Sequence, residues 1–282
     1  MQLIVHGGAG DEPDDPERRQ SVLDEAASVG TEASTPVEAV VRAIDVLESN
    51  PLFNAGVGGA IQEDGVVRTD AGIMTDKREA GAACSMAGVR HAVGVARRVM
   101  AETPHVLLAG EHAAALAEGF DIEPEELTTE RTRERFRAAD PPKTDEIGER
   151  IEWVRERFGG ADTVGAVAVD EGHVAAATST GGRWFALAGR VGDVPQIGCG
   201  FYASPAGGAS ATGAGEDIAR STLAREAVRR LEDGEQPADA AANAIDEFEV
   251  LTGSTAGVIV LDESGQTGSA YNSAAMQTST NF

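Results

Sequence analysis

Thr163 is the residue whose type and position point to the most specific chemistry in this sequence. It begins an expected strand, 163–169, directly after a glycine-broken acidic segment that ends at Asp162. A threonine inside a chain is a poor nucleophile because no base lies beside it. An N-terminal threonine carries its own base, an α-amine whose reference pKa of about 7.7 to 8.0 lies near working pH. Scission between Asp162 and Thr163 would create that nucleophile, whereas an uncut threonine here is simply a β-branched residue that starts a strand.

Hydroxyl groups gather at the end of the next expected strand, 174–178. Thr178, Ser179 and Thr180 precede Gly181-Gly182 and would face Thr163 from a neighbouring strand. The alternative is ordinary cross-strand pairing or turn capping by these side chains.

Two glycine-framed segments follow. Arg190 and Asp193 lie three residues apart in the segment 189–193, which also contains Gly189 and Gly192. A guanidinium holds a carboxylate and a carboxylate holds an ammonium, so the pair suits an α-amino acid group; the alternative is a surface ion pair of little energetic value. Thr212 and Gly213 precede a helix, where a hydroxyl and backbone N–H groups could stabilise an oxyanion or merely cap the helix. A phosphate loop is excluded because the Walker-type lysine is missing.

The hydrophobic pattern predicts the elements that position these residues. Strands are expected at 2–6, 66–70, 82–86, 163–169 and 174–178, and a hairpin pairs 257–261 with 267–271. Helices are expected at 36–48, with a capping box at Thr35 to Glu38, and at 93–100, 104–117, 125–137, 216–232 and 237–248. Residues 139–160 are interpreted as an exposed linker. Strands and helices are segregated, which favours an α+β fold in which helices cover antiparallel sheets.

Composition restricts the partners. The 282 residues, enough for one large domain spanning 1–282, include 23 basic and 47 acidic ones, for a net charge of −24, and only Lys77 and Lys143 are lysines. Such a surface is unsuited to nucleic acid or anionic membranes and is typical of a protein adapted to a salt-rich cytoplasm. Cys84 and Cys199 are expected to be buried and reduced, and no signal peptide or membrane-spanning segment is expected.

In combination and order, these motifs resemble the plant-type asparaginase and isoaspartyl peptidase family, to which aspartylglucosaminidase is related. The resemblance extends over nearly the whole chain and is carried by six segments: 6–10 (HGGAG), 51–56 (PLFNAG), 163–168 (TVGAVA), 176–182 (AATSTGG), 189–193 (GRVGD) and 212–216 (TGAGE).

The resemblance implies an αββα four-layer sandwich made as a precursor that cuts itself between Asp162 and Thr163 into subunits 1–162 and 163–282. Thr163 would be the nucleophile, Thr180 its hydrogen-bond partner, and Thr212 with Gly213 the oxyanion hole. Arg190 and Asp193 would hold the substrate's carboxylate and amine, with Asn54, Gly213 and Gly215 also in the binding site. No catalytic cofactor is implied. A structural sodium ion would be held by backbone carbonyls of Leu47, Glu48, Asn50, Phe53, Ala55 and Val57, and the assembly would be a homodimer of cleaved αβ heterodimers.

The expected activity is hydrolysis of L-asparagine, β-aspartyl dipeptides or both, with release of L-aspartate. Three departures from the family pattern concern substrate choice: Asp162 where glycine is usual, Val194 where serine or threonine is commoner, and Arg183 to Ala186 in place of a more polar stretch. A glycosylasparaginase-like amidase is one alternative, although the HGGAG start favours the asparaginase side. A binding protein of the same fold that never cleaves itself is the other.

Overall fold

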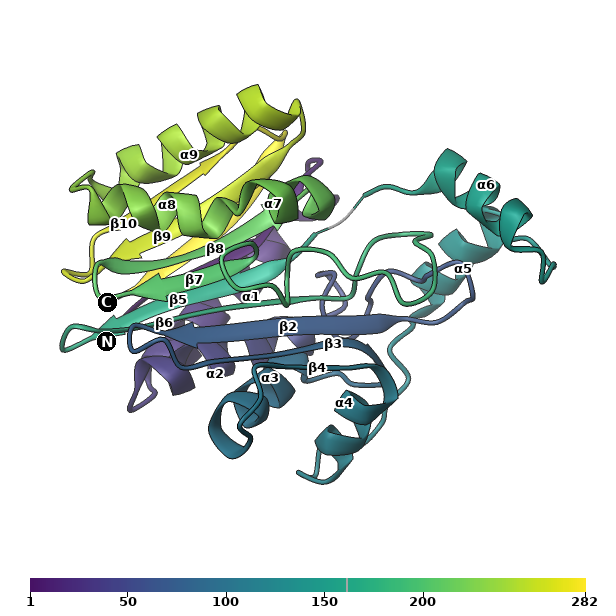
Figure 1. The fold of residues 1–282 in the computed structure, drawn as a ribbon, viewed down its shortest axis with the longest axis horizontal. Helices are drawn as coiled ribbons and strands as arrows, with labels where there is room; N and C mark the ends of the chain where they lie inside the picture. The colour runs from purple at the N-terminus through teal and green to yellow at the C-terminus, as the bar shows by residue number, and fades with distance from the viewer. Residues whose placement is uncertain (161) are drawn as a thin grey trace.

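The computed structural model describes residues 1–160 and 162–282, which form four layers (Figure 1). Two β-sheets lie face to face in the middle. Helices α1, α2 and α3 cover the outer face of the larger sheet, and helices α8 and α9 cover the outer face of the smaller one. This confirms the expected α+β class and the αββα sandwich.

The larger sheet contains seven strands in the order β11-β1-β5-β6-β2-β3-β4. Their bounds are Gln2–Gly10 (β1), Arg68–Thr75 (β2), Ala80–Ala87 (β3), Leu107–Ala109 (β4), Val164–Asp170 (β5), His173–Thr180 (β6) and Ala275–Asn281 (β11). The short edge strand β4 pairs with β3 in parallel, so the sheet is mixed. The expectation of purely antiparallel pairing is wrong there because helix α3 (Ala92–Glu102) makes a crossover between the two strands.

The smaller sheet has four antiparallel strands in the order β10-β9-β8-β7. They are Phe201–Ser204 (β7), Gly207–Gly213 (β8), Ala256–Asp262 (β9) and Thr267–Tyr271 (β10). The predicted hairpin of 257–261 with 267–271 is confirmed, since Gly257 lies opposite Tyr271 and Leu261 opposite Thr267.

The helices are α1 (Pro16–Thr31), α2 (Pro36–Glu48), α3 (Ala92–Glu102), α4 (Gly110–Glu118), α5 (Glu130–Ala138), α6 (Ile147–Arg157), α7 (Gly215–Ser221), α8 (Leu223–Glu232) and α9 (Pro237–Thr252). Helix α2 begins as predicted because the Thr35 side chain accepts a hydrogen bond from the Glu38 N–H. The capping box is only half formed, since the Glu38 carboxylate accepts from the Ser34 N–H instead of reaching Thr35.

The core is built mainly from small apolar residues, which lets the layers approach closely. Between the sheets, Ile4, Val167 and Ile259 pack with Phe201 in one buried cluster. A side chain at Gly72 would overlap the Phe201 ring, so a glycine is required where the smaller sheet meets β2. The strands on either side of Thr163 therefore belong to a sheet that packs closely against the smaller one.

Several elements differ from the sequence prediction. Helix α1 occupies residues for which no element was predicted, and the predicted helix 104–117 is a strand followed by α4 because Gly110 has a positive φ of 62°. The segment 139–160 is not simply a linker: α6 occupies 147–157, buries Trp153 against Phe185 and places Arg150 in an ion pair with Glu63. The predicted helix 216–232 is broken into α7 and α8 at Thr222, which has a left-handed conformation.

Candidate active site

The Asp162–Thr163 peptide lies where β5 begins, beside the end of β6. These strands are antiparallel and Val164 pairs with Ser179, so Thr163 and Thr180 meet at the same edge of the sheet. Both side chains are nearly buried, each with 4% exposure. The sequence prediction that the β6 hydroxyls approach Thr163 is met by Thr180, whereas Thr178 lies deeper between the sheets and donates to the Gly200 carbonyl at 2.8 Å.

The peptide bond between Asp162 and Thr163 is the one expected to break. Its carbonyl oxygen, on Asp162, accepts two hydrogen bonds from side chains. Asn54 Nδ2 donates at 2.7 Å and Thr180 Oγ1 donates at 3.2 Å. Asn54 is itself held in place, since its Oδ1 accepts from the Ala60 N–H at 2.8 Å and its Nδ2 also donates to the Gly182 carbonyl at 2.6 Å. Donors fixed in this way polarise a carbonyl and stabilise the negative charge that forms when a nucleophile attacks it.

The Asp162 side chain packs into the glycine-rich end of β1. A side chain at Gly8, which has a φ of 115°, would come within 2.7 Å of the Asp162 Cβ. Arg19 donates to the Gly7 carbonyl at 2.6 Å and forms an ion pair of 3.3 Å with Asp162. The 6–10 motif therefore makes room for the Asp162 side chain, and Arg19 links that side chain to helix α1.

The residues expected to clamp the substrate lie in the same pocket as Thr163. Arg190, Asp193, Gly213 and Gly215 line a small cavity together with Thr163 and Thr180. A side chain at Gly215 would lie 2.6 Å from Asp193 Oδ1 and 2.9 Å from an Arg190 nitrogen, so glycine is needed between the two charges. Asp193 is 4% exposed, and burial raises its pKa to about 7. A ligand ammonium would stabilise its charged form.

In the intact chain this cavity is almost closed, with a volume of about 10 Å³, roughly enough for one water molecule. Arg190 Nε donates to Glu216 at 2.7 Å, and the Phe158 ring lies 5.7 Å from its guanidinium carbon. Phe158 is just four residues before Asp162. The segment before Thr163 therefore reaches the Arg190 side chain beside the cavity.

Of the two residues expected to form the oxyanion hole, one lines the cavity and the other is buried behind it. Gly213 lines the cavity, whereas Thr212 is fully buried and its hydroxyl accepts a hydrogen bond from the Ala9 N–H at 3.3 Å. Behind them, His6 Nε2 lies 2.9 Å from Ser210 Oγ, and burial lowers the pKa of His6 to about 3, so the ring is neutral. This neutral hydrogen-bonded pair joins the two sheets beneath the site.

Sequence reasoning missed three residues that contact the site from other elements: Arg19, Phe158 and Glu216. Glu216 was visible in the 212–216 motif but had no assigned role. Burial by itself raises its pKa, yet hydrogen bonds from Arg190 and Arg183 lower it to about 2, so Glu216 is ionised. Phe158 lies in the segment interpreted as a linker, Arg19 lies in a stretch for which no element was predicted, and no local pattern marks either residue.

The loop after helix α2, with the last residues of the helix, contains the six carbonyls implied for a sodium ion, and three of them, those of Leu47, Glu48 and Asn50, already accept backbone hydrogen bonds. It folds back onto the helix end, with the Val57 N–H donating to the Glu48 carbonyl at 2.9 Å and Gly56 in a left-handed conformation. Within the described residues, the carbonyls of Phe53, Ala55 and Val57 receive no backbone hydrogen bond, so their lone pairs are available to a hard cation. The negative end of the helix dipole lies at the same place.

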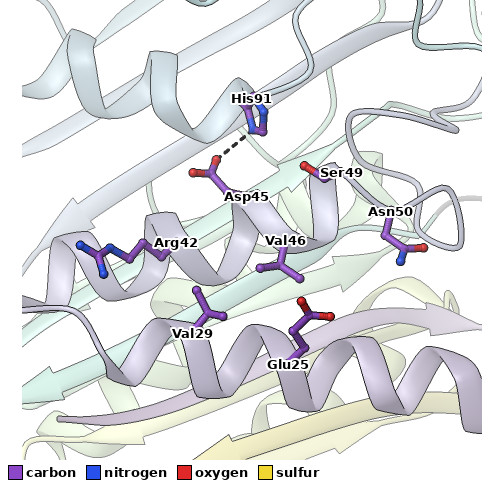
Figure 2. Close-up of a pocket in the computed structure, with 8 residues that line it drawn as sticks. All are labelled: Glu25, Val29, Arg42, Asp45, Val46, Ser49, Asn50 and His91. Carbon is purple, nitrogen blue, oxygen red and sulfur yellow. Dashed lines mark hydrogen bonds and ion pairs between the residues drawn. The ribbon is translucent and has the colours of Figure 1, made fainter.

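A larger groove, of about 490 Å³, lies on helices α1 and α2 and shares no lining residue with the Thr163 cavity (Figure 2). In it, His91 Nδ1 lies 3.1 Å from Asp45, while its Nε2 accepts from Arg90 at 2.9 Å. The neighbouring Glu48 caps helix α3, accepting from the Val93 N–H at 3.0 Å and from Ser179 Oγ. Burial raises the pKa of Glu48 well above its usual value. These contacts are structural and separate from the Thr163 chemistry.

Comparison with known proteins agrees with this geometry. The sequence profile of the family described as asparaginase matches residues 1–281. The chain is 42% identical to the plant-type L-asparaginase of Pyrobaculum calidifontis, over 97% of this chain and 94% of that protein. It is 40% identical to the plant-type L-asparaginase of Pyrococcus horikoshii (96% and 93% covered) and 37% identical to the isoaspartyl peptidase/L-asparaginase of Xenopus laevis (93% and 86%).

Fold and site together define an α+β sandwich protein in which a threonine next to the start of a central strand shares a cavity with an arginine and an aspartate. By full-length similarity, the chain belongs to the asparaginase family.

Proposed function

We propose that this protein is a threonine-dependent amidohydrolase that cuts itself before Thr163 and then hydrolyses L-asparagine, β-aspartyl dipeptides or both. The observation that carries the proposal is the pair of donors on the Asp162 carbonyl, Asn54 at 2.7 Å and Thr180 at 3.2 Å. A peptide carbonyl in an ordinary strand has no need of two converging side-chain donors. The relatives named L-asparaginase and isoaspartyl peptidase support the substrate class.

In the proposed maturation, Thr163 Oγ attacks the Asp162 carbonyl carbon. The Asp162–Thr163 C–N bond breaks, the proton of the Thr163 hydroxyl passes to the departing nitrogen, and the product is an ester on Oγ with a free α-amine. Water then hydrolyses the ester and leaves Asp162 as a carboxylate. The freed α-amine is the base that the embedded threonine lacked.

In turnover, the α-amine accepts the Thr163 hydroxyl proton while Oγ attacks the side-chain amide carbon of the substrate. The proton passes to the leaving amine, which departs and leaves an aspartyl ester; water then releases L-aspartate. Arg190 would bind the substrate α-carboxylate and Asp193 its ammonium, with the oxyanion near Gly213. The nearly closed cavity of the intact chain accords with a precursor that is inactive until it is cut.

The setting of the enzyme is also part of the proposal. Among the described residues no helix is long and apolar enough to cross a membrane. Both cysteines are buried and unpaired, which supports a reducing, cytoplasmic compartment. The charge of −24 supports a salt-rich one. We infer a homodimer of cleaved αβ heterodimers and a sodium ion in the 47–57 loop from the family resemblance.

Intact-mass analysis followed by substrate assays tests the proposal. Scaling 29.1 kDa by the 162 and 120 residues on either side of the cut gives pieces of roughly 17 and 12 kDa. The purified protein is then offered L-asparagine, a β-aspartyl dipeptide and glycoasparagine. Cleavage with release of aspartate from either of the first two is expected. Faster turnover of glycoasparagine would assign the glycosylasparaginase-like alternative, and an intact, inactive chain would refute the enzyme.

A further inference from the structure

Arg183 places a second cation in the Thr163 cavity, at a position that the proposed mechanism leaves unused. It follows Gly181-Gly182 at the end of β6 and lines the same cavity as Thr163 and Thr180. Its side chain is 19% exposed, so its charge is only partly solvated. A partly buried guanidinium interacts with an anion more strongly than an exposed one does.

The hydrogen bonds of Arg183 leave part of its guanidinium free. One terminal nitrogen donates to Glu216 Oε2 at 2.9 Å, while Nε is buried and has no acceptor among the described residues. Glu216 is shared, since its other oxygen accepts from Arg190 Nε at 2.7 Å. One carboxylate therefore lies between two guanidinium groups, and the pair has donors available for a further anion.

The two arginines match the charges of one class of substrate. A β-aspartyl dipeptide has two carboxylates, one on each side of the scissile amide, whereas asparagine has one. Six covalent bonds separate the two carboxyl carbons, which is about 7 Å in an extended chain. The two arginine nitrogens bound to Glu216 lie 2.7 and 2.9 Å from its two oxygens, so their separation is at most about 8 Å, a span that one dipeptide can cover.

We propose that Arg183 forms a carboxylate subsite for the leaving residue of the substrate, while Arg190 binds the carboxylate of the aspartyl part. This inference rests on the function proposed above and specifies its substrate: dipeptides with a free C-terminal carboxylate are preferred over asparagine and over C-terminally blocked dipeptides.

Self-cleavage opens this subsite. In the intact chain the Phe158 ring lies 4.3 Å from the Arg183 guanidinium carbon and also contacts Arg190. Phe158 belongs to the segment that ends at Asp162, so the cut separates it from Thr163 and releases its attachment at one end. The flat faces of both guanidiniums can then be reached by a ligand.

The test compares β-aspartyl-leucine with β-aspartyl-leucinamide, which differ only in the C-terminal charge, on the cleaved enzyme. We expect kcat/KM to be about tenfold or more higher for the free acid, a loss typical of one charge-assisted contact. In Arg183→Met this ratio should fall to about one. Arg135→Met is the matched control: Arg135 stacks on the neighbouring Trp184 at 4.2 Å but does not line the cavity, so the ratio should stay high.

Each outcome decides a separate point. Equal kcat/KM for acid and amide in the unmodified enzyme overturns the subsite, and that comparison needs no variant. A ratio that stays high in Arg183→Met also overturns it; should that variant not mature, Arg183→Gln, which likewise lacks the charge, replaces it with the same substrate pair. If the cleaved protein hydrolyses neither dipeptide nor asparagine, the proposed function itself is refuted, and the subsite with it.

Discussion

Replacing Asn54 by alanine should slow self-cleavage strongly without unfolding the protein. The Asn54 amide donates to the Asp162 carbonyl at 2.7 Å, the shorter of the two side-chain contacts to that oxygen. When Thr163 attacks, negative charge develops on this oxygen, and a fixed donor there stabilises the transition state more than the ground state. Alanine removes the donor and leaves the nucleophile in place.

Loss of one donor to an oxyanion typically costs about 10²- to 10³-fold in rate, or about 2.7–4 kcal/mol of activation free energy. Thr180, at 3.2 Å, would remain, so the Asn54→Ala precursor should still mature slowly. The assay follows the intact 29.1 kDa chain by mass spectrometry over time after rapid purification. Double replacement of Asn54 and Thr180 should abolish the cut.

Asn243→Ala serves as the control, because Asn243 lies exposed on α9, far from the site in sequence, and its side chain donates to Glu235 at 2.8 Å. It should cleave at the unmodified rate. If Asn54→Ala matures as fast as the unmodified chain while remaining folded, the contact to the Asp162 carbonyl has no catalytic role and the reasoning from this geometry is wrong.

Three further predictions concern the nucleophile, the clamp and the surface. Thr163→Ala should give a single 29.1 kDa chain without hydrolase activity, and any cleaved Thr163→Ala protein contradicts the mechanism. The Arg190→Ala protein should still cut itself, but its kcat/KM for asparagine should fall by an amount equivalent to about 2–5 kcal/mol of transition-state stabilisation. Equal hydrolysis of asparagine and an α-blocked analogue by the unmodified enzyme would refute the clamp. The chain has a net charge of −24. Lowering the salt from 1 M to 0.01 M lengthens the screening distance from about 3 to about 30 Å, so repulsion among the acidic side chains increases and the melting temperature should fall. A flat or rising melting temperature would assign the acidic surface another cause.

Local chemistry explains which parts of the fold the sequence predicts well. Thr35 and Pro36 start helix α2 at the expected residue, and the continuous apolar runs of 164–169 and 257–261 appear as β5 and β9. Helix α1 has a weak amphipathic pattern, and its buried residues include Ala26, Ala27 and Gly30. Because the helix packs on β1 and α2, its formation depends on tertiary packing. The exposed charges of α6 likewise conceal Trp153, whose burial against Phe185 is visible only in three dimensions.

The sequence by itself determined the nucleophile candidate, the Arg190–Asp193 pair and the glycines around them, because each depends on residue type and short spacing. The tertiary structure decided what those residues contact. Asn54 and Asp162 are 108 positions apart, and Glu216 is reached from Arg183 and Arg190 across 33 and 26 positions. Such contacts depend on how two sheets pack on one another, and local patterns contain no record of that packing. The donors on the scissile carbonyl and the shared carboxylate between two arginines therefore come from the fold alone.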